Sequence, residues 1–134
     1  MSVIIDASVA LKWVLDEPGS EAAFALRDQA LAAPALWLVE AANGLWRRSL
    51  QGEITEDEAL ERLSELMNAP VRPLPIEADL ISALRLAATL GHPVYDCLCI
   101  AAAIREDTHV VTSDRRLYER TRESAQAERV RLLA

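Results

Sequence analysis

Short apolar runs alternate with stretches of helical spacing along the first part of the chain. Residues 3–5 are apolar and β-branched, which predicts a strand, and apolar positions 10, 11, 14 and 15 predict a helix over 8–15. A Pro-Gly pair at 18–19 interrupts this pattern. The spacing then favours a second helix over 22–31 that ends before Pro34. This part of the chain therefore predicts a strand followed by two helices.

The middle of the chain has the clearest helix signals. Apolar positions 38, 41, 42, 45 and 46 predict a helix over 37–50. Thr55 and Glu58 have the spacing of a capping box, and Ile54 stands where a hydrophobic staple would pack. A further helix is therefore predicted to run to about Met67.

Prolines and apolar runs shape the next part of the chain. Prolines at 70, 73 and 75 restrict 71–74 to an edge strand or an extended link, because proline cannot donate to a sheet. A helix is predicted over 77–90 and closed by Gly91. The His-Pro pair at 92–93 opens another helix, which passes through the almost continuous apolar stretch 97–104. That last helix is expected to be buried.

Two more apolar β-branched runs lie near the end of the sequence. They predict strands at 110–111 and 130–133, and Ser113 can cap a helix that begins at Asp114. Strands that alternate with helices favour a parallel sheet with helices on both faces. The pattern therefore predicts an α/β fold.

Length and composition narrow the class of protein. The chain has 134 residues, of which 51% are hydrophobic and 4% aromatic, so we expect one packed domain over 1–134. No apolar run approaches the roughly 20 residues that cross a bilayer, and Met1 is not followed by a basic and then apolar leader. We therefore expect a cytoplasmic protein without a membrane segment.

Charge and cysteine usage exclude some functions. The net charge is −7, and a protein that coats duplex nucleic acid normally carries the opposite sign. Carboxylates that hold a metal ion could still place a phosphodiester locally. Cys97 and Cys99 are two residues apart in a predicted helix, where their side chains point apart and cannot pair. We interpret both as small buried hydrophobic residues.

Four acidic residues are candidates for a metal site. Asp6 and Asp114 follow predicted strands directly, and ligands of parallel sheets gather outside the carboxyl ends of the strands. Glu40 and Asp96 lie among apolar neighbours in predicted helices. Buried carboxylates that converge on one pocket need a compensating cation, and Mg²⁺ or Mn²⁺ prefers oxygen ligands.

Each acid also has a simpler interpretation. Asp6 and Asp114 could cap the helices that follow them, and Asp96 could be a first-turn acid that the helix dipole favours. Glu40, as an acid in the middle of a helix, has no capping role. Mg²⁺-binding receiver domains and haloacid-dehalogenase-like phosphatases also place acids at strand ends. The first would need a lysine at the site, where this chain has only Lys12, and the second would need an aspartate two residues after Asp6.

The ordered set of motifs resembles the PIN-domain nucleases, and among them the VapC-type toxins of bacterial toxin-antitoxin pairs. The resemblance is carried by Asp-Ala-Ser-Val at 6–9, Glu-Ala-Ala-Asn-Gly-Leu-Trp-Arg at 40–47, His-Pro-Val-Tyr-Asp at 92–96 and Val-Thr-Ser-Asp-Arg-Arg-Leu at 111–117. It extends over essentially the whole chain. Gly44 departs slightly from the family, which more often has alanine or a branched residue there, and costs about 1 kcal/mol of helix propensity.

The resemblance implies a fold, an activity and a set of roles. The fold would be the PIN-like three-layer arrangement, with a parallel sheet of about four or five short strands flanked by about seven helices. The activity would be that of an endoribonuclease dependent on Mg²⁺, for which Mn²⁺ can substitute. The expected partners are RNA, a second copy of the chain in a homodimer, and a cognate antitoxin whose Arg-containing C-terminal segment fills the active site. The residues implied as catalytic and metal-binding are Asp6, Glu40, Asp96 and Asp114, with Ser8, Asn43, Thr112 and Ser113 in support.

Arginines and histidines complete the expected mechanism. Arg115 and Arg116 directly follow the last acid and are candidates for RNA binding. Neither His92, which precedes a proline in a turn, nor His109, which starts a strand, has a clear catalytic place. Metal-activated water is therefore favoured over attack by the RNA 2′-hydroxyl. A catalytically silent PIN-like binding module is the other alternative, and the complete set of four acids argues against it.

Overall fold

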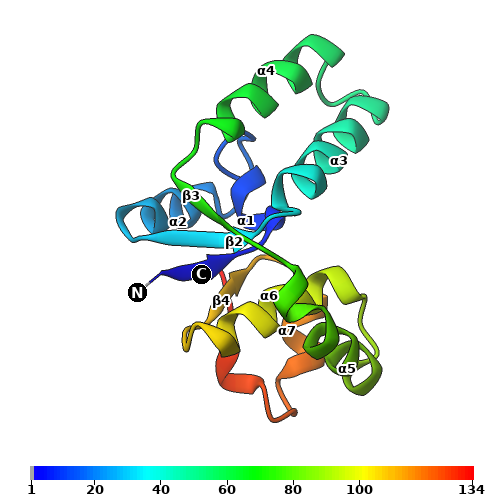
Figure 1. The fold of residues 1–134 in the computed structure, drawn as a ribbon. Helices are drawn as coiled ribbons and strands as arrows, with labels where there is room; N and C mark the ends of the chain where they lie inside the picture. Colours follow the sequence, from blue (N-terminus) through cyan, green and yellow to red (C-terminus); the bar gives the residue numbers. More distant parts are fainter. Residues whose placement is uncertain (1) are drawn as a thin grey trace.

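The computed structural model describes residues 2–134, which contain a five-stranded parallel sheet in the order β3-β2-β1-β4-β5 (Figure 1). The strands are β1 (Val3–Ile5), β2 (Leu31–Pro34), β3 (Val71–Leu74), β4 (Val110–Thr112) and β5 (Val130–Leu132). In the register of the sheet, β1 places Val3 opposite Leu31 of β2 and Ile4 opposite Val110 of β4. Because β1 is the central strand, the residue that follows it lies in the middle of the carboxyl edge.

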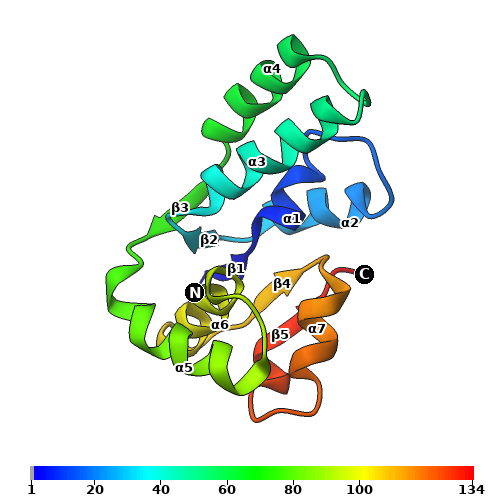
Figure 2. The ribbon, with the colours of Figure 1, turned by 90° about the vertical axis from the view of Figure 1, so that its right-hand side faces the viewer.

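Helices cover both faces of this sheet, as Figures 1 and 2 show. The α-helices in the described part of the chain are α1 (Ala7–Leu11), α2 (Ser20–Ala25), α3 (Trp37–Leu50), α4 (Glu56–Met67), α5 (Leu80–Leu90), α6 (Val94–Arg105) and α7 (Arg115–Thr121). Successive strand residues point to opposite faces, so Val3 and Ile5 pack against α1 to α4 while Ile4 packs against α5 to α7. The predicted three-layer α/β fold is confirmed.

The segment 22–34 differs from its prediction. The helix α2 ends at Ala25, a short 3₁₀ helix follows over Leu26–Asp28, and Leu31–Pro34 is the strand β2. All four residues of β2 are buried, and the strand pairs with β1 on one side and β3 on the other. Leu-Ala-Ala-Pro has no β-branched residue, so burial between two strands decides the structure here rather than local propensity.

Several other predictions hold, with small shifts of element ends. The capping box of α4 is present, with Glu58 N donating to Thr55 Oγ1 at 3.1 Å and Thr55 N donating to Glu58 Oε1 at 3.0 Å. The proline-flanked segment 71–74 is the edge strand β3. Cys97 and Cys99 are both free and buried, as expected. The predicted helix over 77–90 is a 3₁₀ helix, Glu77–Asp79, followed by α5.

One predicted helix end and one predicted helix start need correction. The first helix ends at Leu11, and turns continue the chain, so it is shorter than the predicted 8–15. The last helix is capped by Asp114 and not by Ser113, because Asp114 accepts hydrogen bonds from the backbone N–H groups of residues 116 and 117. Its first helical residue is Arg115.

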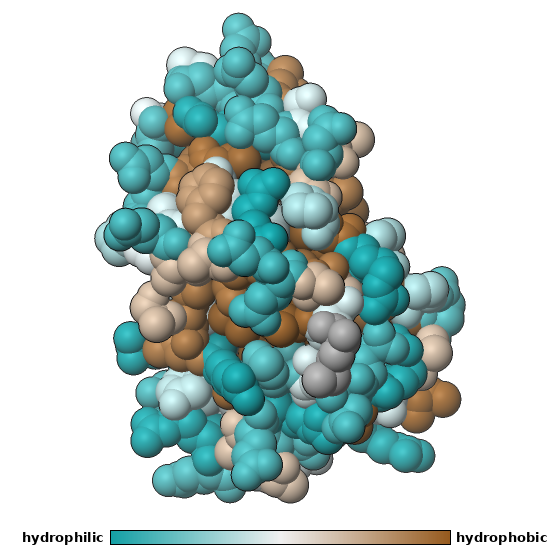
Figure 3. Space-filling view, turned by 90° about the vertical axis from the view of Figure 1, so that its left-hand side faces the viewer, coloured by the Kyte–Doolittle hydropathy of each residue, from teal (hydrophilic) through white to brown (hydrophobic). Residues whose placement is uncertain are grey.

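Figure 3 shows the end at which β1 begins: it is mostly hydrophilic, with apolar residues mainly in the middle. None of the described helices is by itself long and apolar enough to cross a membrane, and the bent pair Glu77–Leu90 and Val94–Arg105 meets that test jointly by length and composition only. The carboxyl ends of the strands, which face the viewer in Figure 2, carry the acidic residues.

Candidate functional site

Four helices begin at one open pocket at the carboxyl edge of the sheet, and each brings one predicted acid. Asp6 is the N-cap of α1, Glu40 and Asp96 lie in the first turns of α3 and α6, and Asp114 is the N-cap of α7. All four line the same cavity, which has a volume of about 830 Å³. The structure therefore brings together the four acids that the sequence singled out.

Asp6 lies at the floor of the pocket and is 7% exposed. Its Oδ1 accepts hydrogen bonds from Ser8 N at 3.1 Å and from Ser8 Oγ, and its Oδ2 accepts one from Thr112 Oγ1. Burial raises the pKa of Asp6 to about 6, although these hydrogen bonds lower it. The negative charge of Asp96, which lines the same pocket, adds to the rise.

The predicted hydroxyl residues divide into two groups. Thr112, fully buried at the end of β4, and Ser8 both contact Asp6 directly. Ser113 contributes its backbone instead, since Ser113 N donates to Ser8 Oγ at 3.1 Å. Thr112 Oγ1 in turn accepts from Asp114 N at 3.0 Å. The pairing of β1 with β4 thus connects the first acid of the chain to the last.

Glu40 lies in the first turn of α3, not in the middle of a helix as predicted. Its carboxylate receives no hydrogen bond from the described residues, and burial raises its pKa to about 7, with the charges of Asp96 and Asp6 adding to the rise. Gly44, one turn further along, explains how α3 packs so closely against α1. A Cβ there would lie 2.6 Å from Leu11 Cδ1 of α1, so the glycine permits close packing of the two helices.

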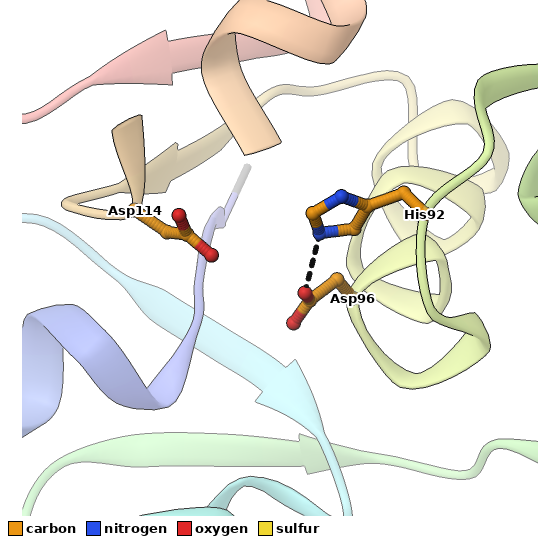
Figure 4. Close-up of side chains that lie close together, drawn as sticks. All are labelled: His92, Asp96 and Asp114. Carbon is orange, nitrogen blue, oxygen red and sulfur yellow. Dashed lines mark hydrogen bonds and ion pairs between the residues drawn. The ribbon is translucent and has the colours of Figure 1, made fainter. Parts of the chain in front are cut away.

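Asp96 is paired with His92 at the start of α6. His92 Nε2 lies 2.6 Å from Asp96 Oδ2, and ligand atoms of His92, Asp96 and Asp114 all lie within 4.8 Å of one another (Figure 4). Burial raises the pKa of Asp96, and the contact with His92 opposes that rise. His92 therefore lies in the pocket and contacts one of the four acids, which the sequence analysis did not predict. The signal that could have found it is the four-residue separation between His92 and Asp96 across a helix start.

Asp114 approaches the same space from the opposite side, as Figure 4 shows. Its Oδ1 accepts hydrogen bonds from Arg116 N at 2.9 Å and Leu117 N at 3.4 Å. Asp114 therefore caps α7 and lines the pocket at the same time. A cap fixes the side chain in one orientation, which is also what a metal ligand requires.

An asparagine and three arginines line the rim of the acidic pocket, and the arginines add positive charge. Asn43 is exposed and lines the pocket one turn after Glu40. Arg47, Arg116 and Arg120 also line it, whereas Arg115 does not. The spacing of Glu40, Asn43 and Arg47 places all three on one face of α3, a signal that the sequence contains. The basic part of the rim therefore comes from α3 and α7.

The chemistry of this donor set suits a hard divalent cation. The pocket offers carboxylate oxygens from four segments, and Mg²⁺ and Mn²⁺ prefer such ligands. The raised pKa values of Asp6 and Glu40 reflect buried negative charges that a cation would compensate. These residues therefore fit a divalent metal site beside which a phosphodiester could bind.

Several known proteins resemble this chain in sequence or in fold. Residues 3–123 match the family model of the PIN domain. Ribonuclease VapC3 of Pyrobaculum aerophilum is 33% identical over 125 residues, which cover 90% of this chain and 95% of that protein. The crystal structure of PAE2754 from Pyrobaculum aerophilum has a TM-score of 0.71 at 24% identity and covers 92% of this chain and 82% of its own. VapBC2 from Rickettsia felis, solved bound to a DNA fragment from its promoter, has a TM-score of 0.64 at 12% identity with both chains fully covered.

Proposed function

Since this chain belongs to the PIN-domain family and is of the VapC type, we propose that it is an endoribonuclease toxin whose activity depends on Mg²⁺ or Mn²⁺. The observation that carries the proposal is the convergence of Asp6, Glu40, Asp96 and Asp114 on one pocket. We further propose that residues 1–134 act as one PIN domain, because the family match extends over 3–123.

The residues of the pocket divide the work of hydrolysis. Asp6, Asp96 and Asp114 would hold the principal ion, and a bound Mg²⁺ or Mn²⁺ supplies an activated water and compensates charge at the scissile phosphate. We propose that Glu40, whose carboxylate receives no hydrogen bond from the described residues, orients the attacking water or helps to hold a second ion. In the first of these roles Glu40 acts as a general base. It accepts a proton from the attacking water as the new P–O bond forms and the bond to the leaving ribose oxygen breaks.

RNA cleavage by the purified chain tests this function. We expect total bacterial RNA to be cut in millimolar Mn²⁺ or Mg²⁺, to stay intact in excess EDTA, and to be cut again when Mn²⁺ is added back. Because water is the nucleophile, the new ends should carry no 2′,3′-cyclic phosphate. Cleavage that persists in EDTA, or that leaves cyclic phosphates, would contradict the mechanism. Sequencing the new 5′ ends would also identify the RNA that is cut.

Two neighbouring arginines allow a matched test of RNA binding. Arg116 lines the pocket beside Asp114, and we propose that it contacts a phosphate of the RNA. Arg115 was an equal candidate from the sequence, but it is exposed and does not line the pocket. Arg47 and Arg120, on the same rim, are further candidates for phosphate contacts.

We expect Arg116→Ala to weaken RNA binding about 10- to 150-fold, the value of one charge-assisted hydrogen bond. The slope of log affinity against log salt should also fall by about 1, as for the loss of one phosphate contact. Fluorescence anisotropy with a short single-stranded RNA, in the inactive Asp6→Asn background, measures both. Arg115→Ala is the control and should bind as the parent does. Equal losses in the two variants would refute a specific contact by Arg116.

Partners follow from the same pocket. We propose that a cognate antitoxin inserts an Arg-containing C-terminal segment among the four acids, because an arginine fork matches carboxylates and the solved relative from Rickettsia felis is a VapBC protein. We propose that this chain acts in the cytoplasm, where it would meet both the antitoxin and the RNA substrate. An antitoxin that binds this chain without reducing RNA cleavage would contradict the insertion.

We also propose a homodimer. The exposed apolar side chains of α5, which are Leu80, Ile81 and Leu84, offer a surface for a second copy. Light scattering at micromolar concentration would contradict the homodimer if it showed a monomer.

A further inference from the structure

Each of the three aspartates in the pocket has its own hydrogen-bond donor. Two hydroxyl groups donate to Asp6, and two backbone N–H groups at the start of α7 donate to Asp114. Asp96 receives neither kind of donor. Within residues 2–134 its hydrogen bond comes from His92, whose Nε2 lies 2.6 Å from Oδ2. The orientation of this third aspartate therefore depends on a histidine.

The backbone around His92 holds the ring in place. Gly91 ends α5 with φ of +64°, in the left-handed region, and Pro93 is the extended N-cap of α6. Between them the carbonyl of His92 accepts a hydrogen bond from Cys97 Sγ at 3.7 Å, and the residue is 6% exposed. Because the side chain is buried and the backbone on both sides of it is ordered, the hydrogen bond to Asp96 costs little further conformational entropy.

The helix α7 braces the same turn from across the pocket. Arg120 Nη1 donates to the carbonyl oxygen of Gly91 at 2.9 Å and to that of Leu90 at 3.3 Å. Because Asp114 caps α7, the turn that carries His92 and the helix that carries Asp114 are tied together. This connection agrees with the close approach of the three side chains in Figure 4.

We propose that His92 is a positioning residue, which donates from Nε2 to Asp96 Oδ2 and leaves Oδ1 directed at the cation. The proposal rests on the proposed function for the cation itself. A hydrogen bond from outside the ligand set fixes which carboxylate oxygen faces a metal, and its loss typically lowers metal affinity about 10- to 100-fold. In this role His92 acts through Asp96 and not by contact with the RNA or the reacting atoms.

Direct ligation by His92 is the competing role. A ring nitrogen that carries the donated proton has no lone pair for a metal, so ligation through Nε2 would require the hydrogen bond to Asp96 to break. Nitrogen ligation would also favour Zn²⁺ over Mg²⁺ or Mn²⁺, because imidazole is a softer ligand than carboxylate. The two roles therefore predict different metal preferences after substitution.

Two amide substitutions separate these roles. Glutamine can place its side-chain N–H near the position of the histidine Nε2, whereas asparagine is too short and reaches only the position of Nδ1. Binding of Mn²⁺ and Zn²⁺ to the purified full chain, without RNA, is measured by titration calorimetry for the wild type, His92→Gln and His92→Asn. His109→Asn, at a half-buried histidine outside the pocket, is the matched control. Melting temperatures in EDTA report whether each variant is folded.

We expect His92→Gln to bind Mn²⁺ within about threefold of the wild type and His92→Asn to bind about 10- to 100-fold more weakly, with Zn²⁺ following Mn²⁺. Wild-type affinity in a folded His92→Asn variant would overturn the proposal. A loss of affinity for Zn²⁺ alone in both variants would also overturn it, because that result would make His92 a direct metal ligand. If His92→Asn does not fold, a drop of more than about tenfold in His92→Gln overturns it and retention supports it. A wild-type chain that binds no Mn²⁺ would overturn the metal site as well.

Discussion

Asp6→Asn is expected to reduce RNA cleavage at least about 100-fold and to abolish growth arrest on expression of the chain alone, while the protein stays folded. Asparagine keeps an oxygen that can accept from Ser8 N and still cap α1. It removes the negative charge at the centre of the site, where a cation must be held. Because Asp6 is 7% exposed, the loss of a buried charge should not lower stability. Cleavage assays and growth curves at matched expression measure the effect.

The control for this prediction is Asp16→Asn, which makes the same chemical change at an exposed aspartate outside the pocket. It should be as active and as toxic as the wild type. Equal toxicity of Asp6→Asn and Asp16→Asn would contradict the role of Asp6. A lower melting temperature of Asp6→Asn in EDTA would instead show that Asp6 serves mainly the fold.

The metal-free protein is expected to lose stability as pH rises from about 4 to about 7. The pKa of Glu40 is raised to about 7 and that of Asp6 to about 6, both above their ordinary values of 4.5 and 3.8. In this range the folded state therefore binds more protons than the unfolded state, so the free energy of unfolding falls as pH rises. The loss is at most about 2–3 kcal/mol for each group.

Glu40→Gln isolates one of the two groups. In EDTA the unfolding free energy of Glu40→Gln should fall less from about pH 4 to about pH 7 than that of the wild type. The difference in unfolding free energy between the two proteins should therefore change in favour of the variant over this range. The stabilisation of the wild type by Mn²⁺ should grow as pH rises, and that of the variant should be smaller. Urea unfolding at several pH values measures this. Glu61→Gln, at an exposed glutamate of α4, is the control. A difference in unfolding free energy that does not change with pH would refute the raised pKa of Glu40.

The four acids could be found from the sequence because they stand beside strong local signals. Asp6 and Asp114 each follow an apolar β-branched run, and the carboxyl ends of parallel strands meet at one edge. The two interpretations of these residues, helix cap and site residue, are compatible in the structure, since both cap a helix and both line the pocket. Receiver-like and phosphatase-like alternatives are set aside by the family match over 3–123, and the cleavage experiment decides between a nuclease and a silent PIN domain.

What the sequence missed depends on contacts between distant segments. The strand β2 is made by burial between β1 and β3, which local propensity does not reveal. His92 was given no catalytic place because it precedes a proline in a turn, yet its Nε2 lies 2.6 Å from Asp96 Oδ2 at the start of α6. Gly44 was a weakness by helix propensity, and it proves to be the place where α3 approaches Leu11 of α1.

The use of Asp6 and Asp114 as helix caps ties the site to the fraying of helix ends. Opening the first turn of α1 or α7 would break the hydrogen bonds from Ser8 N or Arg116 N, and with them the placement of the carboxylate. Helix ends are among the parts of a protein that open most readily by local unfolding. A cation held by both caps would close these openings, so its presence would be recorded as slower hydrogen exchange at amides more than one hundred residues apart in the chain.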